Sequence, residues 1–272
     1  MIVFPNCKIN LGLYVIRKRK DGFHDLETFF YPVPLCDALE IIHIPDIEEK
    51  TTITVTGLAI DNDLAENICL KAYYLLKKDF DLPVVKIHLH KVIPVGAGLG
   101  GGSANGAFTL LLLNKKFNLK ISEERLMEYA LKLGSDCPFF IRNKVCYATQ
   151  RGEVLQPMQL DLSSYKLVVI NPGIHINTGW AFSQIRPKEN RTSLLEIIQQ
   201  PVTNWKDNLV NDFEPAIFEQ HPSIKQIKEK LYQNGAVYAA MSGSGSSVYG
   251  LFEKTATPVL DLPGNYFIKW LM

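Results

Sequence analysis

A run of glycines at residues 96–102 is the part of this sequence best suited to chemistry. The segment PVGAGLGGGSAN places five glycines within seven residues, between a strand-like stretch and a helix-like one. Glycine backbones let N–H groups converge on an anion without interference from a Cβ atom. The start of a helix adds free N–H groups and the positive end of a dipole. The segment therefore predicts a phosphate-binding loop.

We call residues 94–104 the glycine loop. Its predicted ATP-binding members are Pro94, Val95, Gly96, Ala97, Gly98, Leu99, Gly100, Gly101, Gly102, Ser103 and Ala104. The simplest alternative is a tight connection between a strand and a helix. That connection needs fewer glycines, because each surplus glycine costs backbone entropy on folding.

Two familiar glycine-rich loops do not fit this segment. A dinucleotide fold needs an acidic residue that ends a second strand about 20 positions after the motif, whereas Glu123 and Glu124 lie where a second helix should begin. A P-loop requires Gly-Lys-Ser/Thr at its end, whereas this loop ends Gly-Ser-Ala-Asn. His88 and His90 share one face of a strand, but no third ligand accompanies them, so we expect no structural metal.

Alternating strands and a tight turn precede the loop. In KINLGLYVI (residues 8–16), Lys8 and Asn10 face one side while Ile9 and Leu11 face the other, which predicts a half-buried strand. The dipeptide at residues 21–22, Asp-Gly, predicts a hairpin with the next two residues, Phe and His, at its bend.

The remaining elements suggest two successive domains. Strands at residues 52–56 and 84–93 flank an amphipathic helix. Ser103 should cap the helix that follows the loop, and another helix should run from Ser122 to Gly134. A strand, KLVVI, opens the second half, and the strands AVYAAM and VYGLF enclose the turn SGSGSS. We place the boundary near residue 155, with domains at residues 1–155 and 156–272.

Composition excludes several classes of partner. The 272 residues include 29 Lys and Arg against 28 Asp and Glu, which gives a net charge of +1. Such a balance does not indicate a binding surface for nucleic acid or an acidic membrane. The five scattered cysteines favour reduced thiols in the cytoplasm. No signal peptide is evident, and the apolar stretches fall far short of the ~20 residues that span a bilayer.

Three segments together resemble the GHMP kinase superfamily: PNCKINLGL, PVGAGLGGGSAN and AAMSGSGSSVYGLF. Within it, KINLGLYVIRKRKDGFHDLETFF and LGSDCPFF most resemble the family of kinases that act on 4-diphosphocytidyl-2-C-methyl-D-erythritol in non-mevalonate isoprenoid biosynthesis. The resemblance implies an α+β fold, with an N-terminal ATP-binding domain similar to domain 2 of ribosomal protein S5 and a ferredoxin-like C-terminal domain. It also implies transfer of the γ-phosphate of ATP to the 2-hydroxyl group of the methylerythritol moiety, assisted by Mg²⁺.

The resemblance also assigns catalytic roles to residues. The family's catalytic lysine and aspartate fall on Lys8 and Asp136, as electrostatic partner and general base. Taken alone, Lys8 would be a solvated lysine, and Asp136 a turn residue whose carboxylate caps local backbone.

Substrate recognition in the family falls on Asn10, Phe23, His24 and Phe182, which would stack on and hydrogen-bond the cytosine. The simpler interpretation makes the two phenylalanines core residues and His24 an ordinary loop histidine. Phe23 stands where the family usually has tyrosine.

Asn67 and Lys91 fall near family positions that line the adenine pocket. The turn SGSGSS closes over the phosphates in the family. Two rival interpretations remain: a homoserine or mevalonate kinase of the same superfamily, and a catalytically silent nucleotide-binding protein on the same fold. We expect a monomer or weak homodimer that acts on a small molecule.

Overall fold

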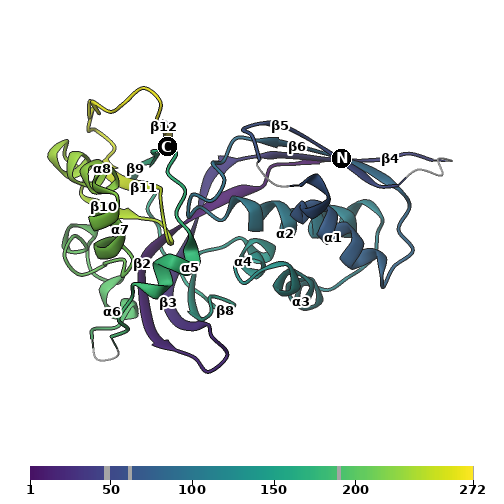
Figure 1. The fold of residues 1–272 in the computed structure, drawn as a ribbon, viewed down its shortest axis with the longest axis horizontal. Helices are drawn as coiled ribbons and strands as arrows, with labels where there is room; N and C mark the ends of the chain where they lie inside the picture. Colours follow the sequence, from purple (N-terminus) through teal and green to yellow (C-terminus); the bar gives the residue numbers. More distant parts are fainter. Residues whose placement is uncertain (46–49, 61–62, 189–190, 272) are drawn as a thin grey trace. The chain divides into compact units, whose positions relative to one another are not determined.

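The computed structural model describes residues 1–45, 50–60, 63–188 and 191–271 (Figure 1). The chain packs into two compact units, and each unit is discontinuous in sequence. Unit 1 comprises residues 1–7, 34–95 and 100–144, and unit 2 comprises residues 8–33, 96–99 and 145–272. The units are defined by packing, whereas the predicted boundary near residue 155 divides the chain into successive domains. That division stays a prediction.

Unit 1 contains a four-stranded sheet. Its strands, in order across the sheet, are β1 (Ile2–Val3), β4 (Ala38–His43), β6 (Val85–Lys91) and β5 (Thr52–Gly57). β5 and β6 are parallel, and the helix α1 (Ile68–Lys77) lies between them in sequence. The predicted strands and crossover helix are therefore confirmed.

Helices cover one face of this sheet. The 3₁₀-helix η1 (Leu64–Glu66) precedes α1, and α1 and the long helix α2 (Gly101–Lys116) lie against the sheet (Figure 1). The helices α3 (Glu123–Leu133) and α4 (Cys137–Arg142) pack beside α2. The Ser122 side chain accepts a hydrogen bond from the Arg125 N–H, and Gly134 follows the last residue of α3. Both predicted ends of this helix are confirmed.

A second sheet begins with the predicted hairpin. Its strands, in order, are β2 (Asn6–Lys18), β3 (His24–Cys36), β7 (Cys146–Gln150) and β8 (Val154–Pro157). Gly22 takes a φ of +86° in the turn between β2 and β3, a conformation that favours glycine. The expectation of a half-buried strand was wrong, because residues 6–15 of β2 are buried on both faces. Leu13 and Val15 pack into an apolar core, while Lys8 and Asn10 are buried among polar groups.

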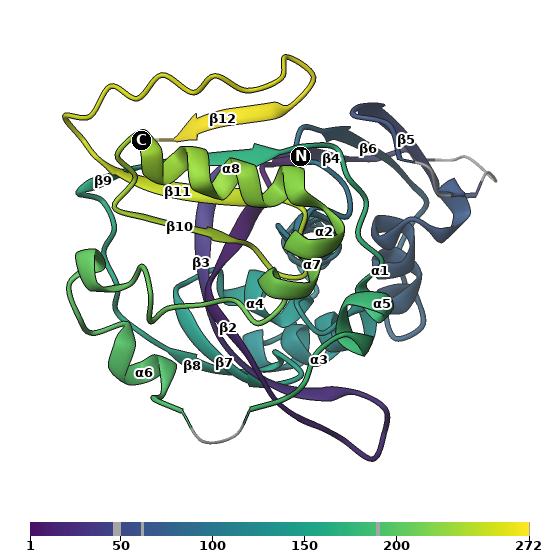
Figure 2. The same cartoon turned by 60° about the vertical axis from the view of Figure 1, so that its left-hand side comes forward.

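The third sheet belongs to unit 2 and is antiparallel. Its strands, in order, are β10 (Tyr238–Met241), β11 (Val248–Glu253), β9 (Tyr165–Asn171) and β12 (Phe267–Leu271). The helices α7 (Glu214–Gln220) and α8 (Pro222–Gln233) cover one face of it (Figure 2). The strands and the turn predicted around SGSGSS are confirmed. The short elements of the unit are α5 (Thr178–Ser183), α6 (Leu194–Ile197) and η2 (Val202–Asn204).

The core of unit 2 lies between α8 and this sheet. Ile224, Ile227 and Leu231 recur along one side of α8, and each is at most 1% exposed. They pack against Val168 and Ile170 of β9. In the part of the chain that the structure describes, no helix is both long and apolar enough to cross a bilayer.

Candidate active site

Unit 2 brings together three segments that lie far apart in the sequence: the start of β2, residues 96–99 of the glycine loop, and the turn at residues 242–247. The Lys8 N–H donates to the Leu99 carbonyl at 2.9 Å. The Ser242 hydroxyl donates to the Gly98 carbonyl at 2.8 Å, and the Ser247 N–H donates to the Ala97 carbonyl at 3.1 Å. These carbonyl groups of the loop therefore accept hydrogen bonds from other parts of the protein.

The N–H groups of the loop are not used in this way. Within the described ranges, no backbone or side-chain acceptor is recorded for the N–H groups of residues 96–103, and the Ala104 N–H is the first to bond, to the Gly100 carbonyl at 2.9 Å. The N–H groups at the start of a helix have no partner within the helix, and they attract anions. The loop thus offers a row of donors to an anion.

Glycine is required at particular places in this loop. Gly96, Gly98 and Gly100 take φ values of +64°, +76° and +70°. A Cβ atom on Gly98 would lie 2.0 Å from the Ser242 carbonyl oxygen, so the two turns pack backbone against backbone. Only glycine takes a positive φ readily and also lets a neighbouring backbone lie this close.

The helix after the loop begins earlier than expected. Ser103 was predicted to cap it, but α2 starts at Gly101, and Gly100 precedes it without any side-chain cap. Gly100 reaches the left-handed conformation that turns the chain into the helix, so no capping side chain is needed to start it. Ser103 instead lies in the first turn, and the uncapped N–H groups of that turn stay available to a ligand.

Lys8 is held firmly in unit 2 and is only 3% exposed, so the solvated-lysine interpretation was wrong. Its ammonium donates to the Asn10 side-chain oxygen at 2.5 Å and lies 4.7 Å from the centre of the Phe30 ring. The Asn10 amide donates to the Thr28 hydroxyl at 2.9 Å, which in turn donates to the Gly12 carbonyl at 2.6 Å. Asn10 is therefore a neighbour that orients Lys8.

Asp136 lies in unit 1, at the start of α4. It is half-buried, and its side chain makes no capping hydrogen bond to α4. The next residue, Cys137, has a thiol whose pKa is raised to about 12 by burial, with a further rise from the charge of Asp136 and a lowering from a hydrogen bond with Ser103. Asp136 therefore adjoins the residue that contacts the first turn of α2.

Two of the predicted base-binding residues are in contact in unit 2. The His24 and Phe182 rings stack with centroids 4.8 Å apart and planes 15° apart. Phe182 also meets the Phe213 ring edge-on at 4.9 Å, which holds it against the core. Partial burial lowers the pKa of His24, and the charge of Lys18 lowers it further. His24 is therefore biased toward its neutral form.

Phe23 is not part of this stack. It is 51% exposed, and among the described residues its ring contact is with the Arg151 guanidinium, 4.9 Å from the ring centre. Phe23 lies immediately before β3, which begins at His24, and its ring lies over Arg151. The expectation that Phe23 is a core residue was therefore wrong.

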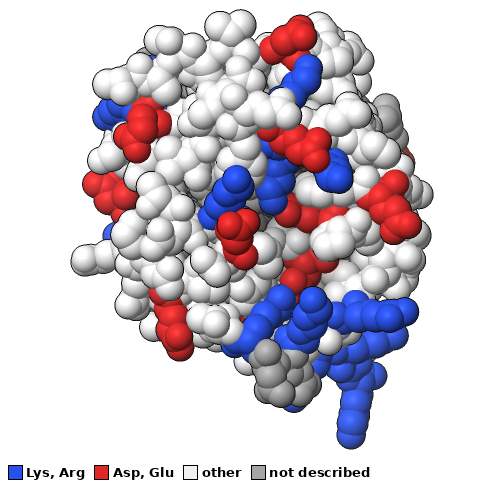
Figure 3. Space-filling view, turned by 90° about the vertical axis from the view of Figure 1, so that its left-hand side faces the viewer, with Lys and Arg blue, Asp and Glu red and all other residues white. Residues whose placement is uncertain are grey.

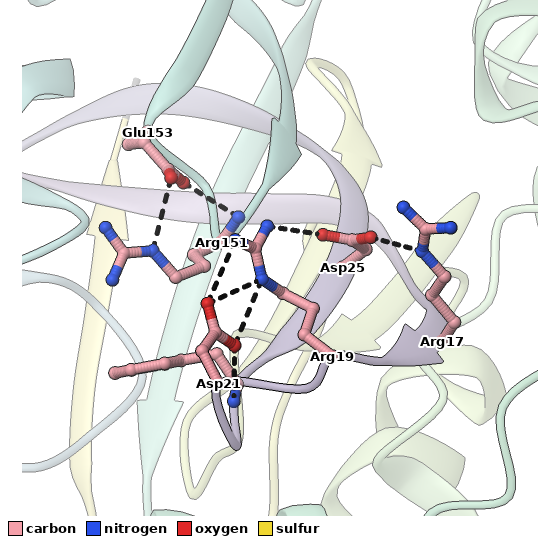
Figure 4. Close-up of polar contacts among 7 residues, drawn as sticks. Arg17, Arg19, Asp21, Asp25, Arg151 and Glu153 are labelled. Carbon is pink, nitrogen blue, oxygen red and sulfur yellow. Dashed lines mark hydrogen bonds and ion pairs between the residues drawn. The ribbon is translucent and has the colours of Figure 1, made fainter.

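Ion pairs brace the hairpin that carries His24 (Figure 4). Arg19 bonds Asp25 at 2.9 Å and Asp21 at 3.0 Å, and Asp21 also accepts the Phe23 N–H at 3.1 Å. Arg17 bonds the other oxygen of Asp25 at 2.5 Å. The guanidinium groups of Arg17 and Arg19 lower the pKa of Asp25. These contacts shape the turn immediately before the stack.

Lys and Arg side chains gather on one edge of unit 2 (Figure 3). We call the exposed Lys18, Lys20, Arg186 and Lys188 the basic patch. The Lys188 N–H donates to the Val15 carbonyl at 3.4 Å, which ties its segment to the hairpin. Counting only residues that the structure describes, no member of the patch has an ion-pair partner. The patch therefore retains its positive charge.

Sequence reasoning missed two residues near the loop. A Cβ atom on Gly96 would lie 3.0 Å from Nδ1 of His175, and the Thr178 hydroxyl is 3.3 Å from the Ser244 hydroxyl. Asn177 caps α5 by accepting the Trp180 N–H at 2.9 Å. This capping signal could have placed the helix, but it does not indicate that the helix start meets the turn at residues 242–247.

The two residues expected near adenine are both buried in unit 1. The Asn67 side chain accepts the Cys69 N–H at 2.9 Å and so caps α1. Lys91 is 3% exposed and is ion-paired with Asp37. Their side chains thus have structural partners.

The donor set suits a nucleotide better than a metal. In the described part of the chain, the N–H groups of residues 96–103 have no protein acceptor, and such a row of donors matches phosphate oxygens. Across the described ranges, no group of three or more His, Cys, Asp or Glu residues is placed to hold a metal ion. A magnesium ion would therefore need ligands from the nucleotide, as is usual for nucleotide-bound Mg²⁺.

Comparison with known proteins gives matches in both halves of the chain. Residues 67–144 match the GHMP kinase N-terminal domain, and residues 194–261 match the GHMP kinase C-terminal domain. The 4-diphosphocytidyl-2-C-methyl-D-erythritol kinase of Bacteroides fragilis is 54% identical over 252 residues, or 93% of this chain and 92% of the relative. The kinase of the same name from Bacteroides thetaiotaomicron is 50% identical over 268 residues, or 98% of each chain.

Solved structures show the same fold. A crystal structure of 4-(cytidine 5'-diphospho)-2C-methyl-D-erythritol kinase matches with a TM-score of 0.77 and 31% identity, over 92% of this chain and 90% of that one. The mevalonate kinase of Methanococcus jannaschii matches with a TM-score of 0.70 and 12% identity, over 100% and 98% of the two chains. The latter likeness concerns the fold alone. Together with the mixed helices and sheets, these matches confirm the predicted α+β fold.

Proposed function

Because the chain belongs to the GHMP kinase family, we propose that it transfers the γ-phosphate of ATP to the 2-hydroxyl group of 4-diphosphocytidyl-2-C-methyl-D-erythritol, in isoprenoid precursor synthesis. One observation carries the site assignment. The N–H groups of residues 96–103 have no acceptor in the described protein, while neighbouring carbonyls are bonded internally. Such a row of donors at a helix start suits the phosphates of ATP.

The catalytic assignment follows from what phosphoryl transfer requires. Asp136 takes the proton of the 2-hydroxyl group as that oxygen attacks the γ-phosphorus, and ADP leaves. Lys8 supplies positive charge where negative charge develops. Its burial, with Asn10 and Phe30 as neighbours, supports this role because a fixed charge in a site sheltered from water acts more strongly than a solvated one.

Recognition of the cytidine group is assigned to the His24–Phe182 stack. The two rings offer a flat platform for a base, and neutral His24 can donate to and accept from its polar edge. Asn10 contributes by orienting Lys8 toward the substrate. Phe23 completes the predicted set, through its exposed ring beside Arg151.

Magnesium would neutralise charge on the β- and γ-phosphate oxygens. We assign its ligands chiefly to ATP, because the described residues form no metal-binding group. We further propose domains at residues 1–155 and 156–272, and action in the cytoplasm by a monomer or weak homodimer. All five cysteines are thiols that form no disulfide, which favours a reducing compartment.

The test is a coupled assay of ADP release. Purified protein with ATP and Mg²⁺ is offered 4-diphosphocytidyl-2-C-methyl-D-erythritol, mevalonate or homoserine in parallel reactions. We expect ADP release that depends on the cytidine compound only. Release that depends only on another acceptor would overturn the substrate assignment, and ATP binding without release for any acceptor would indicate a silent nucleotide-binding protein.

A further inference from the structure

Asp37 is a buried carboxylate that no step of the proposed reaction uses. It lies in unit 1, between β3 and β4, and is 1% exposed. Ionised groups are rarely buried so deeply, because removing a charge from water is costly unless hydrogen bonds satisfy it. The groups that donate hydrogen bonds to Asp37 therefore indicate its role.

The two oxygens of Asp37 bond to opposite ends of the glycine loop. Oδ1 accepts the Val92 N–H at 2.7 Å and the Ile93 N–H at 2.9 Å, immediately before the loop. Oδ2 accepts the side-chain amide of Asn105 at 2.9 Å, immediately after the loop. The ammonium of Lys91 bonds to Oδ2 as well, and it donates to the Asn105 side-chain oxygen at 3.2 Å. One carboxylate thus links the end of β6 to the first turns of α2.

Packing supports the same junction. A Cβ atom on Gly101 would lie 2.9 Å from the Ile93 side chain and 3.5 Å from the Lys91 ammonium nitrogen. The residue before the loop therefore contacts the first residue of α2 directly. Glycine at this position allows the approach, so the ends of the loop are held by both hydrogen bonds and close contact.

Stability alone is a weak reason for this arrangement. A buried ion pair often contributes no more than an apolar pair of similar size, because desolvation offsets the attraction. Hydrogen bonds to defined backbone and side-chain groups do, however, fix geometry. A loop whose ends are fixed loses less entropy when it closes around a ligand.

We propose that Asp37 is a positioning residue for nucleotide binding, which holds both ends of the glycine loop so that its N–H groups are arranged before ATP arrives. The inference rests on the proposed function, because it takes ATP as the anion of the loop. It predicts a loss of ATP affinity that is separate from any loss of fold.

Two double variants form a matched pair for the test. In Asp37→Asn with Lys91→Met, the charges are removed together, and Asn at 37 can still accept the N–H groups of Val92 and Ile93 and donate to Asn105. In Asp37→Ala with Lys91→Met, the charges are removed and the links are lost. Any direct contribution of Lys91 to nucleotide binding cancels, because both variants lack Lys91.

ATP dissociation constants would be measured by calorimetry, with near-UV circular dichroism to show that each variant is folded. We expect the Ala variant to bind ATP about tenfold more weakly than the Asn variant, or worse, a difference of about 1.4 kcal/mol. The KM for the acceptor should be equal in the two variants. Equal ATP affinity in the folded pair, whether normal or reduced, would overturn the proposal.

A milder variant covers the case in which the Ala variant does not fold. Asn105→Ala removes the helix-side link and leaves the Asp37–Lys91 pair in place, so we expect weaker ATP binding with an unchanged acceptor KM. Unchanged ATP affinity in this variant would also overturn the proposal. Failure of the proposed function is distinguishable, because it would appear in the original chain, as absent ATP binding or as absent ADP release with the cytidine compound.

Discussion

Asp136 and Lys8 are the two residues on which the proposed phosphoryl transfer depends. Lys8 lies on a strand buried on both faces, with its ammonium held by Asn10 and Phe30. Asp136 is half-buried, and it precedes α4 without capping it. Asn keeps the size of the Asp136 side chain and removes its charge, which makes the chemical role of the carboxylate testable.

Asp136→Asn should keep the fold and the ATP affinity but reduce kcat by roughly 10²-fold or more, because an amide cannot accept the hydroxyl proton. The measurement is steady-state ADP release, with circular dichroism and ATP titration alongside. Asp261→Asn serves as the control, since that side chain is fully exposed and should leave kcat unchanged. Near-normal turnover of the Asp136 variant would remove it from the mechanism.

The charge of Lys18 acts on His24 in a way that can be measured directly. The pKa of His24 lies below its ordinary value of 6.5, first through partial burial and then through repulsion by Lys18. Loss of that repulsion makes the imidazolium easier to form. Lys18→Met should therefore raise the pKa of His24 toward 6.5, and NMR titration of the imidazole signals would show it.

The shift in the His24 pKa should also change how KM depends on pH. If neutral His24 hydrogen-bonds the cytosine ring, KM for the cytidine substrate should rise as pH falls and His24 becomes protonated. In Lys18→Met this rise should begin at a higher pH. Lys20→Met is the matched control, because Lys20 is a neighbouring exposed cation that does not contribute to the His24 pKa. Equal His24 titration in both variants would contradict the assignment.

Residues 96–99 of the glycine loop and the turn at residues 242–247 form a single packed junction in unit 2. Ser242 bonds the Gly98 carbonyl, and a Cβ atom on Gly243 would lie 3.2 Å from the Gly98 Cα atom. Neither segment could keep this path with a bulkier residue at Gly98. The turn therefore helps to determine which groups of the loop face a ligand.

Gly98→Ala should lower the free energy of unfolding by about 2 kcal/mol or more, because its Cβ atom would clash with the Ser242 carbonyl at a φ of +76°. Gly102→Ala is the control within the same loop, since its Cβ atom would have nothing within 4 Å. That variant should be neutral or more stable by about 0.5–1 kcal/mol, as alanine is favoured in helices. Denaturant unfolding compares them, and equal stabilities would contradict the packing argument.

At the scale of the whole molecule, charge is balanced in sum but not in distribution. The net charge is +1, yet unit 2 carries the basic patch beside the hairpin that holds His24 (Figure 3). A local cluster of one sign raises the concentration of oppositely charged ligands near it. A diphosphate substrate would be attracted to this edge of unit 2.

Lys18→Glu with Lys188→Glu should raise KM for the cytidine substrate a few-fold at low ionic strength, and the effect should shrink in salt because the Debye length falls to about 8 Å at 0.15 M. Kinetics at several salt concentrations measure it. Lys225→Glu with Lys206→Glu is the control, with Lys225 on α8, which lies away from the hairpin (Figure 2). A rise that is independent of salt would instead indicate direct damage to the site.

Local signals allowed many elements to be predicted. The Ser122 cap, the Gly134 end and the Asp21-Gly22 turn depend on interactions within a few residues, and all three are present. Errors arose where distant chain segments decide the outcome. Strand β2 is buried on both faces because segments far along the chain pack against it, and Phe23 turns to Arg151, more than a hundred residues away.

The sequence by itself predicted an anion site, because a dense glycine run before a helix presents donors to an anion, and the class of enzyme was predicted from the resemblance of three segments to the GHMP kinases. It also determined Lys8 and Asp136 as candidates. Only the tertiary structure decided that carbonyls of the loop accept from Lys8, Ser242 and Ser247, while the N–H groups of residues 96–103 have no acceptor among the described residues. It alone placed Asp37 at both ends of the loop, since hydrogen bonds between distant segments leave no periodic trace in a sequence.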